Sequence, residues 1–425
     1  MAQERASPPE ASAPLGQSGT GAELFGGKTG YVHPFLGITE LYSDNVFNSR
    51  GEKKTELTTL VSPGLWLALP GSDARLLDIQ TLNVAPGGLA VSRFEEGPTR
   101  RFRSYALYEM NWEMFAKHPS ENTVNHRAEG LLQYNLRHGI SVDVSDQFLQ
   151  TREPWATGIS SGLDKYRSNL LSLNAAYDTG NRTRFSLGYS NYRIWYEASR
   201  NADRDRKDHL YRGAVSYRLE PKTTGFLEYE HVDIDYDEGV LADSDEDHVF
   251  AGLQWDMTAK SRGRVRAGYG IKDSVRAPAR RDLLYEVQAH HYFSSTDSLR
   301  ITATRRFNES PIGTGSVDPA TGKATQVDHI MSHSLYSQWA HQFTSKFDGF
   351  LNLSYTNDRY EGELSFGGEI KERSDHVYTA GASVEYEPRR WVRVNLGYEF
   401  AQRDSNFADF DYWKNTVFLS ANVGI

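Results

Sequence analysis

Imidazole and carboxylate side chains are the groups of this chain that could do chemistry, and their spacing matches no catalytic or metal motif. His290 and His291 are adjacent, so on a strand their rings would point to opposite faces and could not share a metal ion. The Asp-x-Asp-x-Asp-x-Gly run at 233–239 is similar to a calcium loop, but its glycine is one place late and position twelve is Ser244. No nucleophile elbow, phosphate loop or His-Glu-x-x-His helix is present. We therefore predict no enzyme, metal or cofactor, with a hydrolase site at the rim of the fold as the enzymatic alternative.

Other charged residues alternate with apolar ones, as Arg264 and Arg266 do with Val265 and Ala267. Charge of both signs on one face of a strand cannot be buried unpaired in a dry core, so we expect a hydrated interior. We predict that the path of a solute is lined by Arg127, Arg184, Arg212, Arg264, Arg266, Arg300, Arg393, Glu109, Glu286 and Glu385. The arginine excess favours anionic or hydroxyl-rich solutes, and the equal alternative is that Arg–Glu ladders only brace the wall.

Composition excludes several classes of protein. The chain has 425 residues, no cysteine and a net charge of -9, which argue against thiol chemistry, disulfides, Cys-based zinc sites and general nucleic-acid binding. No run approaches the roughly 18 apolar residues of a membrane-spanning helix. Aromatic residues make up 12% of the chain, too many for wholesale disorder.

The elements that must position these charges are β-strands of about a dozen residues, joined alternately by tight turns and longer polar stretches. The longer stretches are 151–163, 197–207, 236–247, 309–327 and 359–373. Short periplasmic turns and long extracellular loops are typical of an outer-membrane barrel. We predict an all-β, antiparallel, up-and-down transmembrane barrel over 30–425, with about 18 strands and 16 or 20 as alternatives.

The apolar face of each strand should meet lipid, with aromatic residues near the strand ends forming two interfacial girdles. We read 71–101 as a periplasmic or lumen-inserted segment, although an extra hairpin there would give about 20 strands. The final residues, 414–425, alternate up to Ile425, as expected for a last strand that pairs with the first. Residues 1–29 show no signal peptide, so we expect a flexible periplasmic tail of a mature exported chain with an added initiator Met.

Short motifs carry a family resemblance from about residue 30 to the end. The stretch Gly37-Ile38-Thr39-Glu40-Leu41-Tyr42-Ser43-Asp44-Asn45-Val46-Phe47, followed by Val61-Ser62-Pro63-Gly64-Leu65, resembles the opening of a family of Gram-negative outer-membrane barrels. The runs at 185–192 and 219–230 continue the similarity, whereas 71–101 looks like an insertion and Ile425 replaces the usual terminal aromatic residue. Members occur with exopolysaccharide synthesis and export genes, which implies a conduit that works with periplasmic polysaccharide-export proteins. The resemblance supplies no site residues.

These observations predict a porin-like conduit for exopolysaccharide secretion in the bacterial outer membrane. The alternatives are a general or solute-selective diffusion porin, and a structural or adhesive barrel whose loops bind surface glycan or protein. The expected partners are the polysaccharide, outer-membrane lipid, lipopolysaccharide and the periplasmic export proteins, and no nucleic acid. The acidic connection near 233–247 is expected to be a solvated loop, with weak divalent bridging to lipopolysaccharide as an alternative.

Overall fold

The computed structural model describes residues 30–69, 77, 79–93, 101–154, 163–239, 241–255, 260–275, 277–310, 322, 325 and 327–424. The predictions for the tail 1–29 and for Ile425 concern residues outside these ranges. No helix in the described ranges has both the length and the apolar composition needed to cross a bilayer. The described chain is almost entirely β-strand, with five short 3-10 turns.

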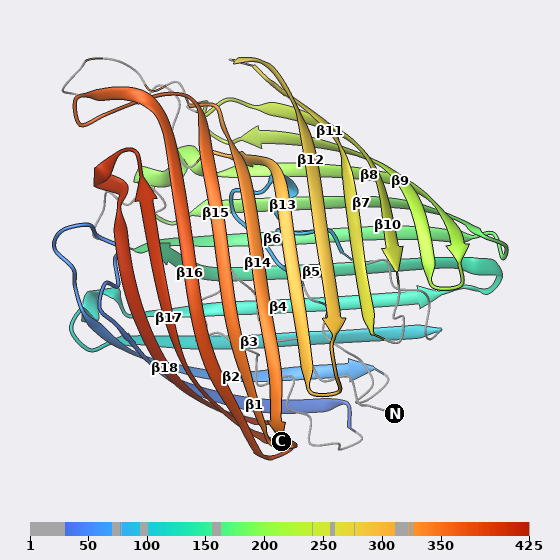
Figure 1. The fold of residues 1–425 in the computed structure, drawn as a ribbon, viewed down its shortest axis with the longest axis horizontal. Coiled ribbons are helices and arrows are strands. Elements are labelled where there is room, and N and C mark those ends of the chain that lie inside the picture. Colours follow the sequence, from blue (N-terminus) through green and yellow to red (C-terminus); the bar gives the residue numbers. More distant parts are fainter. Residues whose placement is uncertain are drawn as a thin grey trace.

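Eighteen antiparallel strands form the sheet (Figure 1). In chain order they are β1 Val32–Ser43, β2 Glu56–Leu69, β3 Phe102–Phe115, β4 Thr123–Asn135, β5 Ile140–Pro154, β6 Leu163–Asp178, β7 Thr183–Tyr196, β8 Arg206–Glu220, β9 Thr223–Tyr236, β10 Ser244–Trp255, β11 Ser261–Ser274, β12 Ala277–Tyr292, β13 Asp297–Glu309, β14 His329–Thr344, β15 Phe347–Phe366, β16 Glu369–Arg389, β17 Val392–Ser405 and β18 Tyr412–Gly424. The 3-10 turns are η4 Pro86–Gly88, η5 Pro119–Glu121, η6 Arg137–Gly139, η7 Ser199–Arg204 and η8 Ala408–Phe410.

The sheet closes on itself because the first strand pairs with the last. The β1–β18 register runs from Phe35 opposite Gly424 to Ser43 opposite Thr416, and β1 also pairs with β2. Every other strand pairs with its neighbours in sequence. The predicted closed barrel with 18 strands is therefore confirmed, and the alternatives of 16 or 20 strands are wrong.

The two faces of each strand have the polarity that a membrane barrel requires. On β9, Leu227 on the outer face is 64% exposed, whereas its neighbour Glu228 on the inner face is only 2% exposed. A water-soluble sheet would bury the leucine and expose the glutamate. Half-exposed aromatic residues lie near both ends of the strands, as the girdle prediction requires: Tyr177, Phe185, Tyr217 and Trp391 at one end, and Trp112, Tyr211, Tyr269 and Trp413 at the other.

Connections at the two ends of the barrel differ in length. The turns that follow the even-numbered strands are mostly tight, and we call this the short-turn end. At one of them, His138 and Gly139 have φ angles of 69° and 83°, in the left-handed region that glycine adopts without strain. A Cβ on Gly139 would collide with the backbone oxygen of Asp178. The opposite end carries the longer connections and is called the long-loop end.

The predicted polar connection at 359–373 is wrong, because β15 and β16 continue through it as a hairpin that turns at Gly367 and Gly368. The ladder contains one irregularity, between Arg359 and Glu363. Tyr360 and Leu364 are buried in a cluster with residues of the last long connection. A stretch rich in polar residues can remain a β-strand outside the membrane, because charged side chains on both of its faces can then be hydrated. Asp245 and Asp247, predicted within the acidic connection, likewise lie in β10.

Candidate functional site

Residues 79–93, which belong to the connection between β2 and β3, make their own tight turn inside the barrel (Figure 1). The N–H of Leu82 donates to the carbonyl of Gly88 over 2.9 Å. Gly87 and Gly88 have φ angles of 69° and 75°, which favour glycine. A Cβ on Gly88 would collide with the Tyr192 ring on β7. The turn therefore lies directly against the barrel wall, and we call residues 79–93 the inserted segment.

One set of anchors ties the inserted segment to β5 and β8. Asn83 Nδ2 donates to Glu153 Oε2 over 3.0 Å, and the N–H of Gly87 donates to Asp208 Oδ2 over 2.8 Å. Asp208 is itself held by Arg206, with 3.0 Å between Nε and Oδ1. Hydrogen bonds to charged groups are stronger than those between neutral groups, so these anchors fix the turn firmly.

A second set of anchors ties the same segment to β12 and β13. The N–H of Ser92 lies 3.1 Å from Glu286 Oε2, and the hydroxyl of Ser92 also donates to Glu286. Gln288 Nε2 donates to the Ser92 carbonyl over 2.8 Å, and Arg306 Nη1 donates to the Ala90 carbonyl over 2.6 Å. Because β5 and β12 are well separated in the strand order, the inserted segment bridges two parts of the wall within the lumen.

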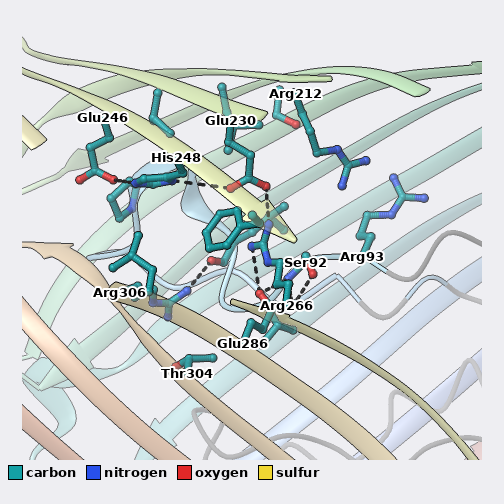
Figure 2. Close-up of a pocket in the computed structure, with 18 of the residues that line it drawn as sticks. Ser92, Arg93, Arg212, Glu230, Glu246, His248, Arg266, Glu286, Thr304 and Arg306 are labelled. Carbon is teal, nitrogen blue, oxygen red and sulfur yellow. Dashed lines mark hydrogen bonds and ion pairs between the residues drawn. The ribbon is translucent and has the colours of Figure 1, made fainter. Parts of the chain in front are cut away.

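A cavity of about 930 Å³, part of it open to solvent, lies between the inserted segment and the wall formed by β6 to β13 (Figure 2). Its apolar lining includes Leu89, Leu210, Val232, Phe250, Leu284 and Phe307. Its charged or titratable lining consists of Arg93, Arg212, Glu230, Glu246, His248, Arg266, Tyr285, Glu286, Arg305 and Arg306. A cavity with both kinds of lining can hold a small molecule that combines polar and apolar groups.

Arg266 is the centre of the ionic network along this wall. Its Nη1 lies 2.5 Å from Glu228 Oε1 and 2.7 Å from Glu230 Oε1, and its Nη2 lies 3.1 Å from Glu286 Oε2. Arg264 adds a contact of 2.9 Å to Glu228 Oε2. The acids of β9 and β12 are therefore neutralised by arginines of β11. Such buried pairs hold adjacent strands in register, although removing one partner would leave a costly unpaired charge.

A second network lies toward the long-loop end. Lys272 Nζ on β11 lies 3.0 Å from Glu246 Oε1 and 2.7 Å from Glu309 Oε1. His248 Nε2 lies 3.1 Å from the other oxygen of Glu246. Both partners of Lys272 are almost completely buried, so this network closes part of the lumen instead of lining open water.

Three cationic side chains at the cavity are less completely neutralised. Arg93 Nη1 lies 3.3 Å from Asp143 Oδ2, and Arg212 Nη1 lies 3.9 Å from Glu228 Oε2. Figure 2 shows the guanidinium groups of Arg93 and Arg212 directed toward one another. Arg306 donates to backbone carbonyls, and among the described residues no carboxylate lies within 4.0 Å of it. Positive potential is therefore concentrated on this part of the lining.

The structure brings four of the ten predicted path residues to one place. Arg212, Arg266 and Glu286 line the cavity, and Arg264 lies beside them through Glu228. All four are on inner-face positions of β8, β11 and β12, as the alternation predicts.

The other six predicted path residues lie elsewhere on the strands. Arg127 on β4 is 2.8 Å from Glu129, and Arg393 on β17 is 3.3 Å from Glu385 on β16, so these pairs act as braces. Glu109 is buried on β3. Arg184 on β7 and Arg300 on β13 do not line the cavity.

Several residues of the site were not among the predicted ones: Ser92, Arg93, Glu228, Glu230 and His248. Glu228 and Glu230 share the polar face of β9, so the alternation contained the signal for them. Ser92 and Arg93 lie in a connection without the alternation of a strand. Nothing in the sequence indicated that they would contact Glu286 and Asp143. Within the described residues, no group of three or more His, Cys, Asp or Glu side chains could hold a metal ion.

Comparisons with known proteins agree with the barrel. A search of curated proteins gave no match. Among solved structures, the outer-membrane protein OpdK of Pseudomonas aeruginosa is 7% identical with a TM-score of 0.47, covering 93% of this chain and 100% of its own. OccAB4 of Acinetobacter baumannii is 10% identical with a TM-score of 0.46, covering 94% of this chain and 99% of its own. The siderophore receptor PirA of Pseudomonas aeruginosa is 8% identical with a TM-score of 0.42, covering 93% and 81%.

These structural similarities are too low to carry an argument about solutes. A family model described as "Putative beta-barrel porin 2" matches residues 100–424, about three quarters of the chain. This family match confirms the resemblance to an outer-membrane barrel, and the association with exopolysaccharide genes stays a prediction. The protein is a porin-like barrel of the bacterial outer membrane, and the chain belongs to the β-barrel porin 2 family.

Proposed function

We propose that this protein is a diffusion porin for small hydrophilic solutes, with a preference for anions. Barrels of 16 to 18 strands are wide enough to leave an aqueous channel. The charged inner wall, exemplified by the buried Glu228 and Arg266, and the porin family of the chain both support passage of solutes through water.

The inserted segment is the observation that carries this proposal. It lies within the lumen and is hydrogen-bonded to Glu153 and Asp208 of β5 and β8 and to Glu286 and Arg306 of β12 and β13. A thick hydrated polymer would have to displace these anchors, whereas a small solute can pass beside them. The findings therefore support the diffusion porin better than the polysaccharide conduit that the sequence suggested first. Polysaccharide, lipopolysaccharide and export proteins remain predicted partners.

The preference for anions rests on the arginines at the cavity. The carboxylates of Glu228, Glu230 and Glu286 are engaged by Arg264 and Arg266. Among the described residues, Arg93 and Arg212 have longer ionic contacts and Arg306 has none. Their charge faces a narrowed lumen in which electrostatic potential is focused. The same arginines could instead serve only as braces, and selectivity measurements separate the two roles.

Planar bilayers test the proposed function directly. Purified protein should give steady single-channel conductance in KCl, and a tenfold salt gradient should give a reversal potential of the sign for chloride preference. Complete absence of conductance under several voltages would rule out an open diffusion porin.

A genetic measurement separates the diffusion porin from the polysaccharide conduit. Deleting the gene in the source bacterium should slow uptake of small anions and leave surface polysaccharide unchanged. Loss of surface polysaccharide, restored by the wild-type gene, would contradict the diffusion porin and support the polysaccharide conduit.

A further inference from the structure

The barrel wall contains a fork between β12 and β13. These two strands pair only from Tyr285 opposite Arg305 to Tyr292 opposite Ser298. The rest of β12, from Ala277 to Leu284, is paired with β11 alone, while β13 continues beside β14 to Glu309. Figure 1 shows the two strands side by side at the short-turn end and apart toward the long-loop end.

Beyond the fork, the end of β13 lies inside the barrel, against the inner face of β9 to β12. Glu309 contacts Lys272 of β11 at 2.7 Å and accepts a hydrogen bond of 2.7 Å from the Tyr236 hydroxyl of β9. The Glu309 N–H donates to Val84 of the inserted segment over 2.7 Å. The outer face of β13 therefore packs on the inner face of its neighbours, and the wall overlaps itself here.

Apolar side chains fill the overlap. Phe307 and Met331, from the inner layer, form a buried cluster with Phe250 and Leu284 from the outer layer. This cluster contrasts with the charged wall on either side of it. Each of the four side chains is less than 5% exposed, so the cluster is a closed apolar contact between the two layers.

The cavity described above extends into this fork. Its lining includes Tyr285 and Arg305, the last pair of the ladder, together with Leu284 on β12 and Arg306 and Phe307 on β13, which lie just beyond the fork. The space beside the inserted segment is therefore continuous with the separation of the two strands.

On the outer surface, one side chain spans the fork. Arg305 Nη1 donates to the Leu283 carbonyl over 2.6 Å, and its Nη2 lies 2.8 Å from Asp282 Oδ1. Leu283 is 53% exposed and pairs with the exposed Tyr269 of the aromatic band. The fork thus opens where hydrocarbon meets head groups, on the long-loop side, which faces the cell exterior in barrels of this kind.

We propose that the fork between β12 and β13 is a binding site and lateral entrance for amphiphilic monoanions, such as medium-chain carboxylates. The apolar chain would enter between the two layers and separate Leu284 from Phe307, which pack in the same buried cluster. The carboxylate would meet Arg306, which lines the cavity, has no carboxylate partner in the described residues, and has a buried Nε without a hydrogen-bond partner. Arg305 holds the two branches of the fork together at the membrane boundary through its contacts with Leu283 and Asp282. The inference rests on the proposed porin function and specifies one class of its solutes.

Current block in planar bilayers tests the site. Octanoate should reduce KCl current at a concentration at least about tenfold lower than butyrate, because each additional buried methylene favours binding several-fold. Leu284→Asn should remove this difference, with each block measured relative to the KCl current of the same variant. The matched control is Leu131→Asn, which places the same amide at a buried apolar position of β4 outside the cavity.

A cross-link tests the lateral route. The chain has no cysteine, so Asp282→Cys combined with Arg305→Cys can be bridged by a bifunctional thiosulfonate reagent. Closing the fork should reduce the octanoate effect to the butyrate level, measured relative to the KCl current of the same cross-linked protein. The two single-cysteine variants, treated with the same reagent, should keep the difference between octanoate and butyrate, because neither can be bridged.

Each failure has a distinct meaning. Conductance without discrimination between octanoate and butyrate would overturn the site, and discrimination that survives the cross-link would overturn the lateral route. Discrimination that disappears when phosphatidylglycerol is added to the bilayer would mean that the fork holds a membrane lipid, which also overturns the proposal. A protein without conductance fails the proposed function, and protection of the Leu284→Cys thiol from maleimide by octanoate still reports on the site.

Discussion

At the scale of single residues, the inner wall of this barrel uses most of its charges to hold itself together. Arg266 contacts three carboxylates from β9 and β12, and Arg393 contacts Glu385 and Glu387 on β16. Arginine suits this role because its planar group donates several hydrogen bonds in fixed directions. The residues left for a solute are those whose charge is incompletely matched, above all Arg212 and Arg306.

Glu286→Gln tests the link between the ionic network and the inserted segment. The change removes the charge that accepts from Ser92 and pairs with Arg266, while Arg266 retains two carboxylates. We expect noisier and larger single-channel currents, with about 1 to 3 kcal/mol lost from the free energy of unfolding. Current recordings and urea unfolding in detergent measure the two effects. Glu385→Gln, on the distant Arg393 pair, should leave channel noise unchanged; equal noise in both variants would contradict this account.

Arg212→Glu tests the origin of the anion preference. Arg212 lines the cavity and its nearest carboxylate is 3.9 Å away, so reversing its charge should shift the reversal potential toward potassium. The Arg393→Gln variant, in which a fully paired arginine outside the cavity is removed, should shift it little. If both variants behave as the wild type, the arginines are braces only.

The sequence could predict which residues face inward but not which of them meet. Alternation places Arg264, Arg266 and Glu286 on inner faces, and the structure agrees. Ser92 and Glu286 are separated by 194 positions, and their contact depends on how a non-strand segment folds within the lumen. No local pattern encodes such a meeting, which explains why Ser92 and Arg93 were missed.

At the scale of elements, the inserted segment depends on one glycine that combines two constraints. Gly88 has a φ of 75° and no room for a Cβ beside Tyr192. Gly88→Ala should therefore displace the segment, at a backbone cost of about 1 to 2 kcal/mol before the collision is counted. We expect a larger conductance with the barrel intact, measured in planar bilayers and by circular dichroism.

The control for this variant is Gly180→Ala. Gly180 has a φ of 80° in a short turn, and a Cβ there would meet nothing within 4 Å. It carries the same backbone cost without touching the segment, so its conductance should match the wild type. Identical currents from the Gly88 and Gly180 variants would show that the segment does not limit the channel.

The strands themselves were largely predictable, because lipid on the outside and water on the inside require apolar and polar side chains to alternate along each strand. The error at 359–373 shows the limit of this rule, since β15 and β16 extend past the membrane where both faces meet water. The fork that begins at the Tyr285–Arg305 pair was equally invisible, because β13 keeps its alternation and its pairing with β14 while it leaves β12.

At the scale of the whole molecule, the barrel depends on the pairing of its first and last strands. Deleting 412–424 removes β18 and leaves β1 and β17 with open edges, whose backbone groups have no partners in lipid. We expect no folded barrel, seen as loss of the heat-dependent shift in gel mobility. A deletion of 366–369, at the tip of the β15–β16 hairpin above the membrane, should retain the shift. A normal shift without β18 would disprove the role of this closure.

The position of the inserted segment has a consequence for biogenesis. It leaves the wall between β2 and β3, directly beside the seam where β1 meets β18. These two strands can pair only after β18 has been delivered to the membrane. The barrel wall near the inserted segment therefore stays open until the end of assembly. The inserted segment can therefore reach its position before the barrel closes. Its contacts with β12 and β13 can then bring distant strands together before β1 pairs with β18.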